Sequence, residues 1–121
     1  LFKTSSFKKK EDRKREIKLM IMLAKVDGKI EDQEKLFLAT EISGIAEFTV
    51  NEKKEFFSLM DASSLPELQK SDVVFYSDEA FKSVVLKLES LAGKDGEIEG
   101  SEKEFIEKVK AINLEFAKPK K

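Results

Sequence analysis

A segment of fifteen residues that occurs twice is the feature that most restricts the fold of this chain. Leu23 to Phe37 and Leu91 to Phe105 are identical at nine of fifteen positions, with a constant offset of 68 residues. Two copies are too few for a repeat solenoid, so the duplication predicts two related helical hairpins packed about a pseudo-twofold axis. In each copy we expect a helix to end, an Asp-Gly pair to turn the chain, and Ile30 or Ile98 to anchor the turn in the core.

Apolar residues elsewhere follow the spacing of one helix face. Ile17, Met20 and Ile21 stand at positions i, i+3 and i+4, and similar spacing recurs after residue 80 and near the C-terminus. The sequence therefore predicts an all-α fold, a compact bundle of about six or seven helices. We expect these helices near residues 11–27, 32–43, 51–60, 64–71, 78–94 and 100–117.

Two local signals lie between the third and fifth predicted helices. Ser64 with Pro66 is typical of a cap followed by proline in the first helical turn. The run Val73 to Tyr76 has strand-like composition, but a lone strand would lack a partner, so we expect a buried connection. Most of the ten phenylalanines are expected in the core, because aromatic rings at helical spacing usually serve packing.

The length of 121 residues suits one domain, which we expect over residues 11–117, between a basic lead-in at 1–10 and a basic tail at 118–121. No apolar run approaches the roughly 18 residues that a membrane-spanning helix needs. We therefore expect a soluble protein, with a cytoplasmic location as the default.

Composition removes several classes of chemistry. The chain has no cysteine and no histidine, which excludes disulfides, cysteine nucleophiles and histidine acid–base catalysis. A formal net charge of -1 gives no overall attraction to nucleic acid or membranes. Basic residues do gather near the N-terminus, where we expect a solvated helix start and no specific nucleic-acid partner. They are Lys3, Lys8, Lys9, Lys10, Arg13, Lys14, Arg15 and Lys18.

The doubled pattern Leu-Ala-x-x-Asp-Gly, followed by x-Ile-Glu-x-x-Glu, resembles the TerB-like tellurite-resistance family, whose domain also forms the N-terminal part of the DnaJ-like protein DjlA. The resemblance covers about residues 17–116, although Asp32 and Gly100 stand where the family often has proline. It implies a compact helical domain, a link to stress responses at the cell membrane, and a metal centre in the acidic loops. The implied ligands are Asp27, Glu31, Glu34, Asp95, Glu99 and Glu102.

The ligand types restrict which ion such a centre would take. Without imidazole or thiolate, the expected cofactor is a hard divalent cation, calcium or magnesium. The loops are not EF-hands, because loop positions 1 and 3 would be Leu23 and Lys25 in one copy and Leu91 and Gly93 in the other. The same carboxylates also have a structural interpretation, in which Glu34 and Glu102 cap the following helices through backbone amides.

We expect a non-enzymatic module that binds a divalent metal and other proteins, with a peripheral membrane-associated complex as one setting that the resemblance implies. A docking adaptor without metal is one alternative. A carboxylate-dependent enzyme is a second and less favoured alternative, since no phosphate loop and no nucleophile with a neighbouring base accompanies the carboxylates. The sequence leaves the oligomeric state open.

Overall fold

The computed structural model describes residues 2–26, 30–62, 66–92 and 100–116, and all regular structure over these residues is helical. The expectation of an all-α fold is therefore confirmed. The helices are α1 (Phe2–Lys25), α2 (Asp32–Ser43), α3 (Val50–Asp61), α4 (Lys70–Val73), α5 (Asp78–Ala92) and α6 (Gly100–Phe116). None of the described helices has the length and apolar character needed to cross a membrane.

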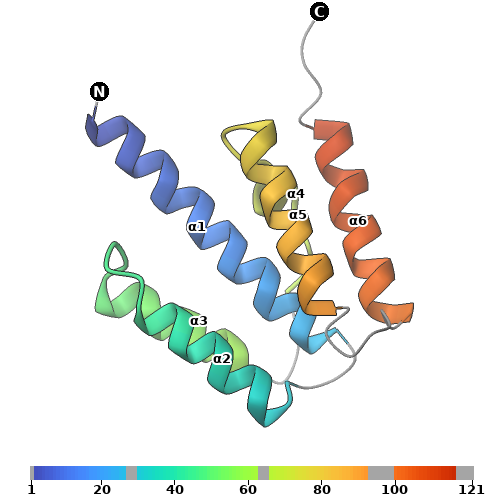
Figure 1. Cartoon of the computed structure of the whole chain (residues 1–121), viewed down its shortest axis with the longest axis horizontal. Helices are drawn as coiled ribbons and strands as arrows, with labels where there is room; N and C mark the ends of the chain where they lie inside the picture. Colours follow the sequence, from blue (N-terminus) through green and yellow to red (C-terminus); the bar gives the residue numbers. More distant parts are fainter. Residues whose placement is uncertain (1, 27–29, 63–65, 93–99, 117–121) are drawn as a thin grey trace, which may run out of the picture.

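Helix α1 is the centre of the molecule. It packs against each of the other helices, with α2 and α3 on one side of it and α5 and α6 on the other (Figure 1). Within its second half, the run from Leu19 to Ala24 is apolar on every face, and Ile17 together with Leu19 to Leu23 is at most 2% exposed. A helix that is apolar all round must be covered all round, which explains its central position.

Helix α3 is fixed to α1 at its first turn. Thr49 accepts the backbone N–H of Glu52 at 3.1 Å, and the Glu52 carboxylate accepts the backbone N–H of Thr49 at 2.8 Å, which is a capping box. Lys10 and Lys14 of α1 approach the same carboxylate at 3.1 and 3.4 Å. The Thr49 amide and then these two ammonium groups lower the pKa of Glu52 to about 2, although partial burial opposes the shift.

Lys25 joins the last turn of α1 to the end of α3. Its side chain is buried, and its ammonium donates to the carbonyl oxygens of Leu59 at 2.9 Å, Met60 at 3.3 Å and Ala62. Carbonyl groups at a helix C-terminus lack partners within the helix and favour a cation. Both ends of α3 are therefore held by charged side chains of α1.

The basic side chains of α1 are not simply solvated, which corrects the expectation for residues 10–18. They form ion pairs with other helices, including Arg13 with Glu41 of α2 at 3.7 Å and Lys18 with Asp72 of α4 at 2.8 Å. Their side chains are half-buried, because each aliphatic stem lies along the bundle while its charged end meets a carboxylate. This group of charges orients the neighbouring helices around α1.

Two predicted boundaries are wrong. The first helix begins at Phe2 instead of near residue 11. The helix predicted over 64–71 is absent from residues 66–69, and α4 occupies Lys70–Val73. The start is set by Asp72, whose carboxylate accepts the backbone N–H of the extended residue Gln69 at 2.9 Å.

The buried connection predicted for Val73 to Tyr76 is confirmed in part. Val73, which ends α4, and Phe75 are buried and Val74 is half-buried against the core, whereas Tyr76 is exposed. Asn113 of α6 donates to the Val73 carbonyl at 2.7 Å and holds the connection in place. The expectation for the phenylalanines also holds among the side chains described. Six of them are buried or pack against the core: Phe48, Phe56, Phe57, Phe75, Phe81 and Phe105.

Candidate functional site

The two copies of the repeated segment meet at one end of the bundle. The C-terminal ends of α1 and α5 and the N-terminal ends of α2 and α6 converge there (Figure 1). Between them is a pocket with a cavity volume of about 30 Å³, which is room for one or two water-sized groups. We call it the inter-repeat pocket. It is lined by Met20, Leu23, Ala24, Glu34, Phe37, Leu38, Leu91 and Glu102.

Two pairs of lining residues occupy equivalent positions in the repeat. Leu23 pairs with Leu91 and Glu34 with Glu102, each at the offset of 68 residues. The floor is apolar, and Met20 and Leu23 on it are each 2% exposed. Both glutamates are half-buried. The fold therefore brings one carboxylate from each copy to a single apolar pocket.

Glu34 has a defined structural role. Its Oε1 accepts the backbone N–H of Glu31 at 3.2 Å, and Glu31 is the extended residue that precedes α2. The expected capping role of Glu34 is thus confirmed. Since a carboxylate has about four lone-pair sites, this bond is compatible with a further contact in the pocket.

The structure describes three of the six predicted metal ligands. Glu34 and Glu102 line the inter-repeat pocket, and Glu31 is exposed at the start of α2. Asp27, Asp95 and Glu99 lie outside the described residues, as does Ile98. Among the residues that are described, no three acidic side chains gather in a way that could hold a metal ion. Ile30, the expected anchor of the first turn, does pack against the core.

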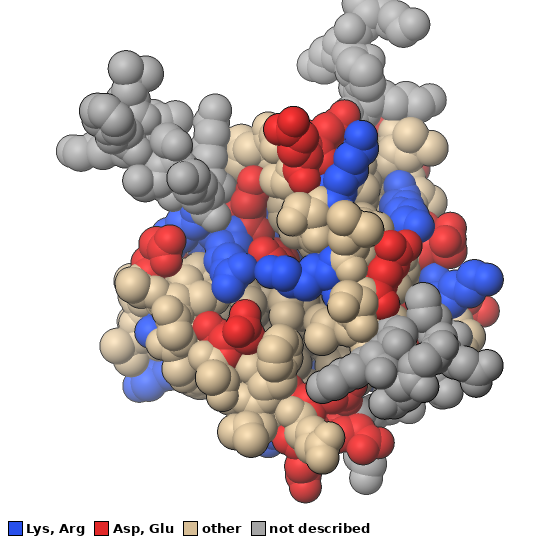
Figure 2. Space-filling view, in the orientation of Figure 1, with Lys and Arg blue, Asp and Glu red and all other residues tan. Residues whose placement is uncertain are grey.

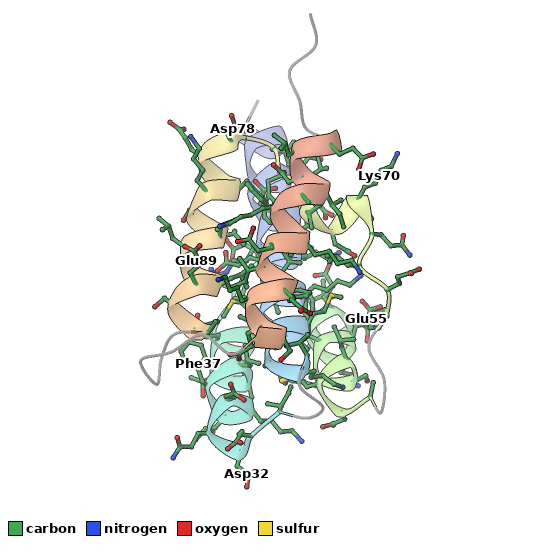
Figure 3. The ribbon with its side chains drawn as sticks, turned by 90° about the vertical axis from the view of Figure 1, so that its right-hand side faces the viewer. Asp32, Phe37, Glu55, Lys70, Asp78 and Glu89 are labelled. Atoms are coloured by element: carbon green, nitrogen blue, oxygen red, sulfur yellow. The ribbon has the colours of Figure 1, made fainter. Side chains whose placement is uncertain are left out.

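The apolar rim of the pocket was not predicted from the sequence. Phe37 lines the pocket with 42% of its surface exposed, and its neighbour Leu36 is 69% exposed. Figure 3 places Phe37 where α2 meets the end of α5, away from Asp32 at the tip of α2. The sequence did contain an indication of an exposed apolar residue. Leu36 to Ala39 are four consecutive apolar residues, and a helix that turns about 100° per residue cannot direct all four toward the protein core.

The surroundings of the pocket are mainly acidic. The first turn of α2 carries Asp32 and Glu34, and the first turn of α6 carries Glu102. Figure 2 shows acidic side chains gathered at the end of the molecule where α2 begins. Lys35 is the nearby cation on α2, and it pairs with Asp61 of α3 at 2.6 Å, which raises the pKa of Lys35.

A second and larger pocket, of about 350 Å³, lies between α1, α3 and α4. Its lining includes three cations, each of which meets a carboxylate: Lys14 with Glu52, Arg15 with Asp12 and Lys18 with Asp72. Burial is the main influence on Asp12 and raises its pKa, despite the Tyr76 amide and Arg15, which lower it. These charged side chains are paired with one another within the fold, and they do not indicate a particular ligand for the second pocket.

The chain matches no family model, no curated protein and no solved structure. The TerB-like resemblance of the doubled motif therefore stays a prediction.

Proposed function

We propose that this chain is a non-enzymatic protein-interaction module whose docking site is the inter-repeat pocket. The observation that carries the proposal is the combination of an apolar floor, a carboxylate from each copy and the exposed Phe37 at the rim. Interfaces concentrate binding energy in aromatic anchors around a small apolar centre, with polar groups at the edge. The pocket has this composition.

Docking is favoured over catalysis by the size and chemistry of the pocket. Substrate pockets commonly measure about 300–1,000 Å³, whereas this cavity measures about 30 Å³. Its polar side chains, among the lining residues described, are the two glutamates. We also propose that the α1–α2 and α5–α6 hairpins are duplicates related by a pseudo-twofold axis. The shared pocket supports this relationship, because equivalent residues line it from both copies.

A divalent cation, calcium or magnesium, is the second candidate ligand. It is favoured by the convergence of Glu34 and Glu102, which are two of the six carboxylates that the TerB-like resemblance implies. Such an ion would supply positive charge to hold the two acidic turns together. The link to tellurite resistance or another stress response, and a setting near a membrane, rest on the resemblance alone.

The docking proposal is tested by comparing partner binding between two matched double variants of the full chain. The rim variant, Leu36→Ser with Phe37→Ser, removes the Phe37 ring from the pocket lining together with the exposed Leu36 that precedes it on α2. Leu86→Ser with Leu114→Ser removes two equally exposed leucines from α5 and α6, at 67% and 65% exposure. Proteins retained by the wild type and the control variant, but lost from the rim variant, support docking at the pocket. Equal retention by both variants would refute it.

Repeating the comparison with chelator and with calcium separates the two candidate ligands. Partner binding that persists in chelator supports an adaptor without metal. Binding that requires calcium supports a metal-dependent module.

A further inference from the structure

We infer that the outward side of α2 binds a second copy of this chain, with the two α2 helices antiparallel across a twofold axis. The inference concerns a surface beside the inter-repeat pocket and does not depend on the proposed docking function. Two observations carry it. The outward side of α2 is exposed and uncharged, and the two ends of α2 carry opposite charges.

The outward side of α2 has no charged side chain. Six exposed residues share it, because they stand at positions i, i+3, i+4, i+7, i+10 and i+11, opposite the buried Leu38 and Ile42. We call them the α2 face: Gln33, Leu36, Phe37, Thr40, Ser43 and the C-cap residue Gly44. Figure 2 shows a largely uncharged surface over α2, beside the acidic side chains at its start.

An uncharged face stands out in this chain. Charged residues make up 39% of the sequence, and the exposed positions of α6 include Glu104 and Lys108. The centres of protein–protein interfaces are depleted of charged residues. The α2 face therefore has the composition of an interface centre.

The second half of the α2 face allows another helix to approach closely. Thr40, Ser43 and Gly44 are all small. Gly44 has a φ of -83°, which any residue can adopt, so the backbone does not require glycine there. Among the described residues, a side chain at Gly44 would come near only backbone oxygens of α2 itself, those of Thr40 at 3.5 Å and Glu41 at 3.7 Å. This end of the face is open to a neighbouring helix.

The two ends of α2 carry opposite charges. Glu31 and Asp32 are exposed at its start. Its other end lies beside Lys53 of α3, whose ammonium donates to the carbonyl of the last residue of α2 at 3.0 Å. The next residue, Lys54, is exposed, so the two lysines outweigh the exposed Glu47 of the α2–α3 connection.

An antiparallel pair of α2 helices brings these opposite charges together. Asp32 and Ser43 are eleven residues apart, which is about three helical turns, so they lie on the same side of α2. A twofold axis through the middle of the α2 face would place Asp32 of each copy beside Lys53 of the other. Lys53 can meet a carboxylate while it keeps the Ser43 carbonyl, since an ammonium has three donors. The surface is complementary to itself, which favours a second copy over an unrelated partner.

The size of the α2 face limits the affinity. A helix of 12 residues is about 18 Å long, and one side of it is smaller than the roughly 800 Å² that each partner buries in a stable complex. We expect a reversible dimer with a Kd on the order of 10–100 µM.

Sedimentation velocity of the full chain, between about 5 and 500 µM, tests the inference through mass action. The wild type should shift from monomer to dimer over this range. Thr40→Glu places a charge at the centre of the α2 face, outside the pocket lining, and should weaken the dimer at least about tenfold. Ser83→Glu, at an exposed position of α5, is the matched control and should leave the dimer unchanged.

Charge reversal tests the antiparallel arrangement. Asp32→Lys and Lys53→Glu should each weaken the dimer, since each variant brings like charges together at both ends of the interface. An equal mixture of the two variants should recover dimerisation, because both contacts of the mixed dimer then join opposite charges. A melting curve of each variant checks that the fold is kept.

Three outcomes would overturn the inference. A wild type that stays monomeric up to about 500 µM would leave the α2 face to a different protein. A dimer that Thr40→Glu does not weaken would be held by another surface. If the charge reversals have no effect, or if their mixture does not recover, the antiparallel arrangement is wrong. The docking proposal is decided separately, by partner retention of the rim and control variants.

Discussion

Phe37 and Phe105 occupy the same position in the two copies of the repeat, yet Phe37 is 42% exposed at the pocket rim and Phe105 is 7% exposed in the core. Helix α6 turns its phenylalanine inward, together with Ile106 and Val109. Helix α2 directs Leu38 and Ile42 inward and leaves its phenylalanine at the surface. The same residue type therefore packs in the core in one copy of the sequence repeat and lines the pocket in the other.

This difference predicts unequal effects on stability. Phe105→Ala should lower the free energy of unfolding by about 3–5 kcal/mol, as expected for a large side chain removed from a core. Phe37→Ala should lower it by less than about 1 kcal/mol, since the ring is partly solvated already. Urea denaturation of the two variants measures both values. Similar losses would mean that the two rings pack alike.

Lys25→Met should destabilise the end of α3. Methionine keeps an unbranched apolar stem, one atom shorter than lysine, but the carbonyl groups of Leu59, Met60 and Ala62 lose their shared donor. We expect a loss of about 1–2 kcal/mol, together with faster hydrogen exchange in the last turn of α3. Lys54→Met, at an exposed position of the same helix, is the matched control and should change stability by less than about 0.5 kcal/mol. A loss no larger than that of the control would contradict the capping role of Lys25.

The capping box of α3 predicts a pH dependence. The pKa of Glu52 is about 2 in the fold and near 4.5 otherwise, so the unfolded chain binds more protons between these values. The stabilisation from this carboxylate is therefore fully present above about pH 4.5 and is lost as the pH falls toward 2.

Glu52→Gln isolates this contribution. At neutral pH the variant should be about 1 kcal/mol less stable than the wild type, because it keeps a cap acceptor but loses Lys10 and Lys14. The difference should shrink below pH 4.5 and disappear only as the pH falls through about 2. Unfolding curves of both proteins across this pH range measure it, and a difference that is constant with pH would be inconsistent with a lowered pKa.

The metal candidate predicts a thermal shift. A cation that binds only the folded chain raises its melting temperature, so calcium should stabilise the wild type relative to chelator. Glu34→Gln with Glu102→Gln should reduce the shift, and so should Asp27→Asn with Asp95→Asn. Melting temperatures that are equal in calcium, magnesium and chelator, together with no heat in titration calorimetry, would exclude the metal.

Local patterns in the sequence were enough to predict most helices. The apolar spacing around Ile17 to Leu23 identified the central helix, and the bounds of α2 agree with the predicted 32–43. The start of α4 was predicted wrongly, because two local signals for a helix start lie close together. Ser64 and Pro66 indicated a helix start, but the Asp72 carboxylate meets the Gln69 amide and starts α4 further along the chain.

Long-range contacts explain what the sequence could not predict. Lys14 and Lys18 form ion pairs with Glu52 and Asp72, which lie on other helices far along the chain. The sequence around these lysines does not distinguish long-range ion pairs from a series of solvated charges. Part of the candidate site could be predicted from the sequence. The repeat singled out Glu34 and Glu102, but the apolar rim at Phe37 becomes a site feature only once the fold leaves that ring at the surface.

Site-specific photo-crosslinking tests docking at the inter-repeat pocket most directly. The photoreactive residue p-benzoyl-phenylalanine is placed at Phe37 in one protein and at Leu114, on α6, in the other. Both are irradiated in the cells that express them. We expect a discrete protein adduct from position 37 that is lost when Glu34→Gln and Glu102→Gln are added, and no such adduct from position 114. The same adduct from both positions, or from position 114 alone, would contradict docking at the pocket.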